Sequence, residues 1–119
     1  MIAQPTMSDC IQACVQCAQD CEHCANACLG EKDVAMMANC IRLDRDCSAI
    51  CWQAASFMSR GSEFAQQLCQ LCAEICEACG QECQKHEHDH CQKCAQSCLD
   101  CADQCRRMAG VVTGNSSAI

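Results

Sequence analysis

Cysteine recurs along this chain at alternating steps of four and three residues, which is the spacing of one face of an α-helix. The first run, CIQACVQCAQDCEHCANAC, spans residues 10–28, and similar runs span residues 69–83 and 91–105. A sparser run covers residues 40–51. Side chains spaced in this way lie on a single stripe that faces partner helices. The spacing therefore predicts helices that each bury a column of thiols.

The helical period divides the chain into four segments with short breaks between them. The predicted helices cover residues 8–29, 33–60, 62–85 and 89–109. Ser8 and Ser62 are the expected N-caps of the first and third helices, and a glycine follows the first, second and fourth. Long helices joined by short loops predict an all-α fold, an antiparallel up-down-up-down four-helix bundle with a cysteine-lined interior.

The length of 119 residues is that of a single domain. We predict an N-terminal arm over residues 1–7, the four-helix bundle over residues 8–109 and a flexible C-terminal tail over residues 110–119, where the helical period is lost. In an up-down-up-down bundle the first and third connections share one end. The second connection shares the other end with both termini.

All 19 cysteines fall on the predicted stripes and are the candidate metal ligands. They are Cys10, Cys14, Cys17, Cys21, Cys24, Cys28, Cys40, Cys47, Cys51, Cys69, Cys72, Cys76, Cys79, Cys83, Cys91, Cys94, Cys98, Cys101 and Cys105. The stripe of the second helix also places Asp44 inward, and a lone acid among thiols is costly to bury. Either Leu43 takes the inward position, or Asp44 pairs with a neighbouring arginine.

Composition argues against several other classes of protein. The net charge of −7 disfavours nucleic-acid binding, and no apolar run approaches the roughly 20 residues that span a membrane. An odd number of cysteines cannot pair completely within one chain, and one proline and five glycines are few for a loop-rich disulfide scaffold. The N-terminus, MIAQPTMSDC, does not resemble a signal peptide. We therefore expect a cytoplasmic protein with reduced thiols.

Thiols are too small to fill the space that leucine fills in an ordinary bundle, so this interior should enclose something else. Soft thiolates select Cu(I), zinc or iron–sulfur clusters, and the chain lacks the CxxCxxC runs common in iron–sulfur sites. Four zinc tetrathiolate sites would leave a charge of about −8 in the interior, whereas one Cu(I) per thiolate leaves it near neutral. Multiple Cu(I) ions are therefore favoured. A zinc-binding bundle and a thiol redox buffer are the alternatives.

The segment KHEHDH, residues 85–90, connects the third and fourth predicted helices and carries three of the four histidines. Two methionines near the start of the second helix share that end of the bundle. Imidazole and thioether are suitable transient copper ligands. We therefore predict a site of metal uptake formed by His86, His88, His90, Met36 and Met37. The alternative is a solvated loop that happens to be rich in histidine.

The opposite end of the predicted bundle gathers large apolar side chains. These are Met7, Phe57, Met58, Phe64 and Met108. We expect them to form an apolar plug without a metal role, so that ions pass through the end that carries the histidines.

Two classes of enzyme share part of this pattern. The run from Glu87 to His90 matches the Glu-x-x-His motif of di-iron bundles, but those proteins carry two copies and further inward glutamates. A thiol oxidoreductase would place Cys-x-x-Cys next to a strand, and no strand is evident. We therefore expect no catalytic residues and no enzyme activity.

Taken together, these motifs resemble those of the cytosolic copper storage proteins, a family of cysteine-lined four-helix bundles. The resemblance covers roughly residues 8–109. It is carried by the cysteine stripes and by CIRLDRDCSAIC (40–51), LCAEICEACGQEC (71–83) and HEHDHCQKCAQSCLDCADQC (86–105). It implies storage and detoxification of multiple Cu(I) ions by thiolates in the interior, copper at the histidine end, and a homotetramer. Delivery of copper by a chaperone or a small thiol is also expected.

Overall fold

The chain folds into a bundle of four antiparallel helices, described in a computed structural model that covers residues 6–117, with side chains up to residue 109. The elements are α1 (Met7–Leu29), η1 (Val34–Met37), α2 (Ala38–Ser59), α3 (Ala65–Gln84) and α4 (Asp89–Ser117). Helices α1 and α3 each contact both α2 and α4. The predicted all-α bundle is confirmed, and residues 6–117 contain no strand. None of the helices in this range is long and apolar enough to cross a membrane.

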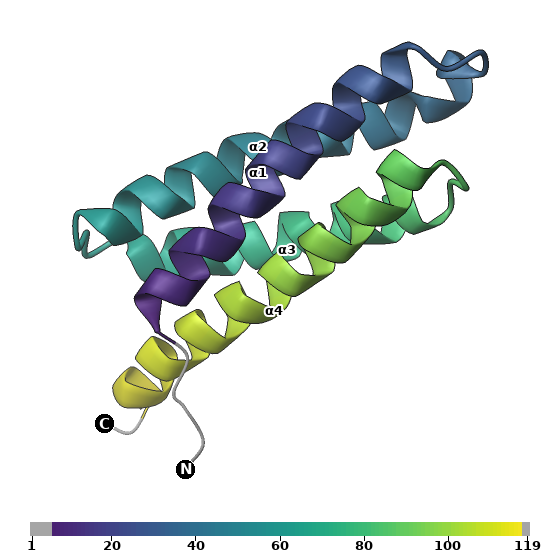
Figure 1. Ribbon diagram of the computed structural model, residues 1–119. Coiled ribbons are helices and arrows are strands. Elements are labelled where there is room, and N and C mark those ends of the chain that lie inside the picture. Colours follow the sequence, from purple (N-terminus) through teal and green to yellow (C-terminus); the bar gives the residue numbers. More distant parts are fainter. Residues whose placement is uncertain (1–5, 118–119) are drawn as a thin grey trace.

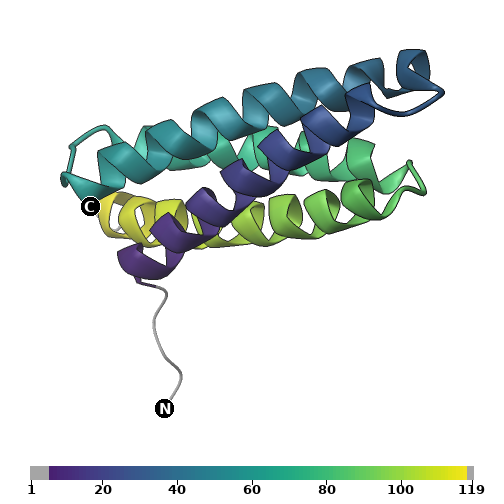
Figure 2. The ribbon, with the colours of Figure 1, turned by 45° about the horizontal axis from the view of Figure 1, so that its top comes forward.

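The two ends of the bundle carry different connections. Figure 1 shows the α1–α2 and α3–α4 connections together at one end, whereas the α2–α3 connection lies at the other end with the start of α1 and the end of α4. The turned view in Figure 2 shows the same arrangement. We call the end with the α1–α2 and α3–α4 connections the histidine end, defined by residues 30–37 and 85–90. The other, with residues 60–64, is the opposite end.

The first two helices begin at different residues from those predicted. Thr6, not Ser8, is the N-cap of α1, because its hydroxyl accepts a hydrogen bond of 3.0 Å from the backbone N–H of Asp9. A 3-10 turn, η1, occupies the predicted first turn of the second helix, so that α2 itself begins at Ala38.

The connection between α2 and α3 is longer than predicted. Gly61 adopts a φ of 66°, a left-handed conformation that glycine tolerates without strain, and it closes α2 as expected. Ser62 is not the N-cap of α3, which begins at Ala65. Its hydroxyl instead accepts a hydrogen bond from the backbone N–H of Phe64 at 3.1 Å.

The fourth helix extends beyond its predicted end. Helix α4 starts at Asp89, as expected, but continues past Ala109 to Ser117. The predicted end of the fourth helix at residue 109 was therefore wrong, whereas the predicted flexibility of residues 110–119 stays a prediction. Residues 113–117 read TGNSS, a composition of weak helix formers, which is why the sequence pattern does not reveal this extension.

The core consists of cysteine, alanine and methionine rather than the usual leucine, isoleucine and valine. Each of the 19 cysteines is at most 1% exposed. Alanines lie beside the cysteine stripes, and their small side chains allow the helices to approach. The fully or almost fully buried ones include Ala18, Ala25, Ala54, Ala73, Ala95 and Ala102. Partly buried branched residues such as Ile11, Val15 and Ile41 pack against this core.

Two contacts outside the cysteine stripes hold pairs of helices together. A Cβ at Gly80 of α3 would lie 2.8 Å from the side chain of Leu99 in α4, so glycine permits this close approach. On the other side of α4, the carboxylate of Asp20 in α1 accepts hydrogen bonds from Gln16 and Ser97. These contacts fix the position of α4 against both neighbours.

Candidate metal centre

The Sγ atoms of all 19 cysteines form one continuous column along the bundle, which we call the sulfur column. All 19 cysteines are free thiols. Neighbouring sulfurs lie between 3.4 Å apart, as in Cys40–Cys83, and 4.0 Å apart, as in Cys17–Cys21. The column arises because each helix presents its cysteines at steps of three and four, and short antiparallel connections bring the stripes together. The predicted inward direction of every stripe is confirmed.

The sulfur column contains groups of four thiols that could each hold a metal ion. Within each group the ligand atoms all lie within 4.8 Å of one another. They include Cys14/Cys51/Cys72/Cys101, Cys17/Cys21/Cys47/Cys98, Cys17/Cys47/Cys51/Cys76, Cys21/Cys79/Cys94/Cys98 and Cys24/Cys28/Cys40/Cys91. Several cysteines belong to two groups, so the groups overlap. Overlapping groups are typical of a multinuclear assembly, whereas a single zinc site has four ligands of its own.

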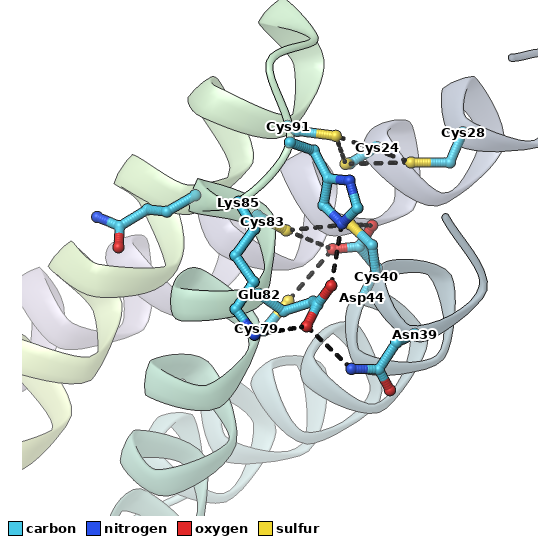
Figure 3. Close-up of polar contacts among 12 residues, drawn as sticks. Cys24, Cys28, Asn39, Cys40, Asp44, Cys79, Glu82, Cys83, Lys85 and Cys91 are labelled. Carbon is cyan, nitrogen blue, oxygen red and sulfur yellow. Dashed lines mark hydrogen bonds and ion pairs between the residues drawn. The ribbon is translucent and has the colours of Figure 1, made fainter. Parts of the chain in front are cut away.

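Asp44 lies beside the sulfur column, at the position where the stripe of α2 would place another cysteine. Its carboxylate is fully buried. Thiols from α3 and α4 donate hydrogen bonds to Oδ1, at 3.2 Å from Cys79, 3.2 Å from Cys94 and 3.5 Å from Cys83. Cys40, one turn away on α2, donates to Oδ2 at 3.8 Å. Figure 3 shows Asp44 with Cys40, Cys79 and Cys83 around it.

Neither of the two predicted solutions for Asp44 is correct. Leu43 is only partly buried and does not replace the acid in the interior, and the described partners of Asp44 are thiols rather than an arginine. Burial, together with the neighbouring Cys94 and Cys40, raises the pKa of Asp44 to about 9. The carboxyl group therefore holds a proton at neutral pH while the column is free of metal.

At the histidine end, the sulfur column is continued by His90. Its Nδ1 lies 3.5 Å from the sulfurs of both Cys24 and Cys91, and 3.9 Å from that of Cys28. Its Nε2 lies 3.1 Å from an oxygen of Glu31. Burial raises the pKa of Cys28 to about 11 and also raises that of Cys91. These thiols therefore keep their protons until a metal displaces them.

The other two histidines of the predicted uptake site face carboxylates. His86 Nε2 lies 2.9 Å from Glu82, whose pKa is lowered chiefly by this histidine, and Asn39 also donates to Glu82 at 3.0 Å. Figure 3 shows the contact between Asn39 and Glu82. His88 Nδ1 lies 3.5 Å from Glu31. The prediction did not include Glu31 or Glu82, because their pairing depends on how the two connections meet in space.

The two methionines of the predicted uptake site separate. Met37 is fully buried in the core, whereas Met36 is 73% exposed. The structure thus brings His90 and Met37 to the end of the buried column and leaves Met36 at the surface. His23, the remaining histidine, is exposed on α1.

The predicted apolar plug at the opposite end is smaller than expected. Met58 and Met108 are buried, at 2% and 7% exposure. Phe57 is partly buried, and Phe64 and Met7 are exposed. At this end of the column, the sulfur of Cys105 lies 3.8 Å from that of Cys10 and 3.7 Å from that of Cys14.

Comparison with known proteins agrees with this geometry. The sequence profile of the family described as copper storage protein matches residues 3–110. Among solved structures, the Cu(I)-bound copper storage protein BsCsp3 and the apo form of copper storage protein 3 from Bacillus subtilis are each 51% identical. For both, the match covers 87% of this chain and 99% of the other, with a TM-score of 0.83.

Two further structures extend the comparison. A cytosolic copper storage protein from Streptomyces lividans, with five coppers, is 40% identical over 87% of this chain and 92% of that one, with a TM-score of 0.85. The Nmul_A1745 protein from Nitrosospira multiformis is 37% identical over 88% and 95%, with a TM-score of 0.79. No protein with a curated description matches. The family profile covers most of the chain, so this chain belongs to the copper storage protein family.

Proposed function

We propose that this protein stores Cu(I) as a multinuclear thiolate assembly in the interior of its bundle, with about one ion for each of its 19 cysteines. The observation that carries the proposal is the overlap of the four-thiol groups, which share members along one buried column. A column of shared ligands has no boundary at which filling would stop. The relatives described as Cu(I)-bound or copper-loaded support the same metal.

Charge supports Cu(I) over zinc. Among the described residues, the buried polar or charged side chains are Asp20, Asp44 and Ser48, so no lysine or arginine lies beside the sulfurs. Zinc bound by four thiolates would leave two negative charges at each site, and uncompensated buried charge costs several kcal/mol. Each Cu(I) that replaces one thiol proton leaves the charge of the interior unchanged. A monovalent soft ion therefore fits this interior best.

Copper exchange takes place at the histidine end in this proposal. His90 joins the surface layer of carboxylates to the first thiols of the column, since its two ring nitrogens face Glu31 and Cys24. An incoming Cu(I) would bind His90 Nδ1 and then pass to the sulfurs, while a thiol proton leaves to solvent. His86, His88, Met36 and Met37 would assist as transient ligands around this position.

The proposal also includes the location of the protein, its oligomeric state and its source of copper. We place the protein in the cytoplasm as a homotetramer without enzyme activity, supplied with copper by a chaperone or a small thiol. The relative described as a cytosolic copper storage protein supports this location. Storage would also detoxify, because Cu(I) held by buried thiolates is kept away from other cellular thiols.

Anaerobic titration of the reduced protein with Cu(I), against a competing chromophoric chelator, tests the function. Saturation near 19 equivalents is expected. Saturation by four or five equivalents of Zn(II), with little tightly bound copper, would contradict storage and favour the zinc-binding alternative. A protein isolated from the cytoplasm with several stable intrachain disulfides would instead favour a thiol redox buffer.

A further inference from the structure

Outside the sulfur column, two imidazoles at the histidine end converge on one carboxylate. His90 Nε2 lies 3.1 Å from Oε1 of Glu31, and His88 Nδ1 lies 3.5 Å from Oε2 of the same residue. The two rings stack with their centroids 5.3 Å apart and an interplanar angle of 4°. The three side chains come from the α1–α2 connection, the α3–α4 connection and the first turn of α4. They therefore bring together donors from segments far apart in the sequence.

The spacing of these donors suits a small divalent ion. Ligands about 2.0–2.1 Å from a tetrahedral Zn(II) lie about 3.3 Å from one another. The distances from the two histidines to Glu31, each to a different carboxylate oxygen, fall on either side of that value. An oxygen of Asp33 lies 3.8 Å from the other nitrogen of His88, Nε2. A carboxylate in that position commonly orients a metal-bound histidine by accepting its remaining N–H.

The chemistry of this cluster differs from that of the sulfur column. Imidazole and carboxylate are ligands of divalent zinc and copper, whereas Cu(I) prefers thiolates. Glu31 and Asp33 place two carboxylates beside the two imidazoles, and a divalent ion balances the charge of two carboxylates. We propose that Glu31, His88 and His90 form a separate site for a divalent cation of the Zn(II) type, with water as the fourth ligand and Asp33 supporting His88.

A divalent ion at this site would compete with the uptake and release of Cu(I) through His90, a consequence that rests on the proposed copper storage. A neutral imidazole has one N–H and one nitrogen with a free lone pair. A divalent ion on His90 Nε2 therefore requires the proton to be on Nδ1, and Nδ1 then cannot bind Cu(I). The two ions exclude each other at His90, and each weakens the binding of the other by the same factor. The site would act as a metal-dependent gate.

Co(II) is a spectroscopic probe for this site. It would be added to protein loaded with no more Cu(I) than its thiolates hold, so that copper occupies the sulfurs and leaves His90 Nδ1 free to keep its proton, and the copper content would be measured first. A failure of copper storage is then seen before, and separately from, a failure of this site. We expect one Co(II) per chain, with visible bands but no sulfur-to-cobalt charge transfer, and we expect Glu31→Gln and His88→Ala to abolish it.

Glu87→Gln is the control for Glu31→Gln, since it removes the same charge from an exposed position at the histidine end, in the α3–α4 connection that also carries His88. It should leave Co(II) binding intact. Absence of Co(II) binding, charge-transfer bands from sulfur, or equal binding by the Glu31→Gln variant would each overturn the site. As a second readout, Zn(II) should slow removal of Cu(I) by a Cu(I)-selective chelator severalfold in the unmodified protein and not in Glu31→Gln. An unchanged removal rate in the unmodified protein would overturn the competition.

Discussion

The two halves of the sulfur column differ in what accompanies the sulfurs. Near the opposite end the column contains only thiols and is closed by Met58 and Met108. Near the histidine end it includes the carboxyl group of Asp44 and the imidazole of His90. The same helical spacing of cysteines thus serves two environments.

This difference indicates that the two halves have different roles, storage capacity near the opposite end and copper exchange near the histidine end. Thiols alone provide capacity, because soft ligands hold Cu(I) tightly and methionines seal their end from water. A carboxyl group and an imidazole bind Cu(I) less strongly and can carry or release protons, so they are suited to exchange. Substitutions in the two halves should therefore differ in whether they change stability, exchange rates or copper capacity.

The largest expected effect comes from replacing Asp44, which distinguishes the histidine half. A buried acid with a raised pKa binds its proton in the folded state, so folding stability falls as pH rises from its ordinary value of 3.8 to about 9. The free energy of unfolding decreases by at most about 1.4 kcal/mol for each pH unit in this range. Asp44→Asn removes this slope and raises the stability of the metal-free protein at neutral pH. Denaturant unfolding at several pH values under anaerobic conditions measures it.

Asp46→Asn is the control, because it changes an exposed acid two residues further along the same helix. It should keep the pH dependence of the unmodified protein. If Asp44→Asn and Asp46→Asn showed the same slope, the pH dependence would come from groups other than Asp44, and Asp44 would not distinguish the two halves.

The next effect tests the closed end. Met58→Ala should reduce the free energy of unfolding of the metal-free protein by about 2–5 kcal/mol, because it leaves a cavity beside the last thiols. Met36→Ala changes a side chain that is 73% exposed at the histidine end and should cost less than about 0.5 kcal/mol. Urea unfolding of both variants provides the comparison. Equal losses would mean that the two ends are sealed alike.

The third effect concerns rates. His90→Phe should slow both loading and chelator-driven removal of Cu(I) by about tenfold, equivalent to about 1.4 kcal/mol in activation free energy, while copper capacity changes little. Stopped-flow absorbance with a chromophoric chelator measures it. His23→Phe makes the same substitution at an exposed position on α1 and should leave the rates unchanged. Unchanged rates in His90→Phe would place exchange elsewhere.

The sequence predicts most of this fold because one pattern repeats. Steps of three and four over residues 10–28 determine both the helix and its buried face, and short connections leave only an antiparallel bundle. The pattern fails where partners come from other segments. Asp44 is stabilised by thiols of α3 and α4, and the sequence could not show that three sulfurs converge on its carboxylate.

Local geometry explains the other differences between the predicted uptake site and the structure. Met36 and Met37 were both predicted at the uptake site, but adjacent residues in a helical turn point in directions about 100–120° apart. One stripe can therefore bury only one of them, and the turn η1 selects Met37. Glu31 was missed because it follows the end of α1, where no period applies, and it meets His90 only when two connections come together.

The smallest expected effect compares single thiols at the two ends. Cys91→Ser and Cys105→Ser each replace one soft ligand by a hydroxyl that does not bind Cu(I) well. Each should lower the capacity by about one ion of roughly 19 in a titration with Cu(I). Of these two cysteines, Cys91 lies on the proposed exchange route, 3.5 Å from His90 Nδ1, and Cys105 does not. Cys91→Ser should therefore also change the rate of copper removal, whereas Cys105→Ser should not. Because the capacity loss is the same, a difference in rate reports position alone, and a matching rate change in Cys105→Ser would mean that copper leaves through both ends.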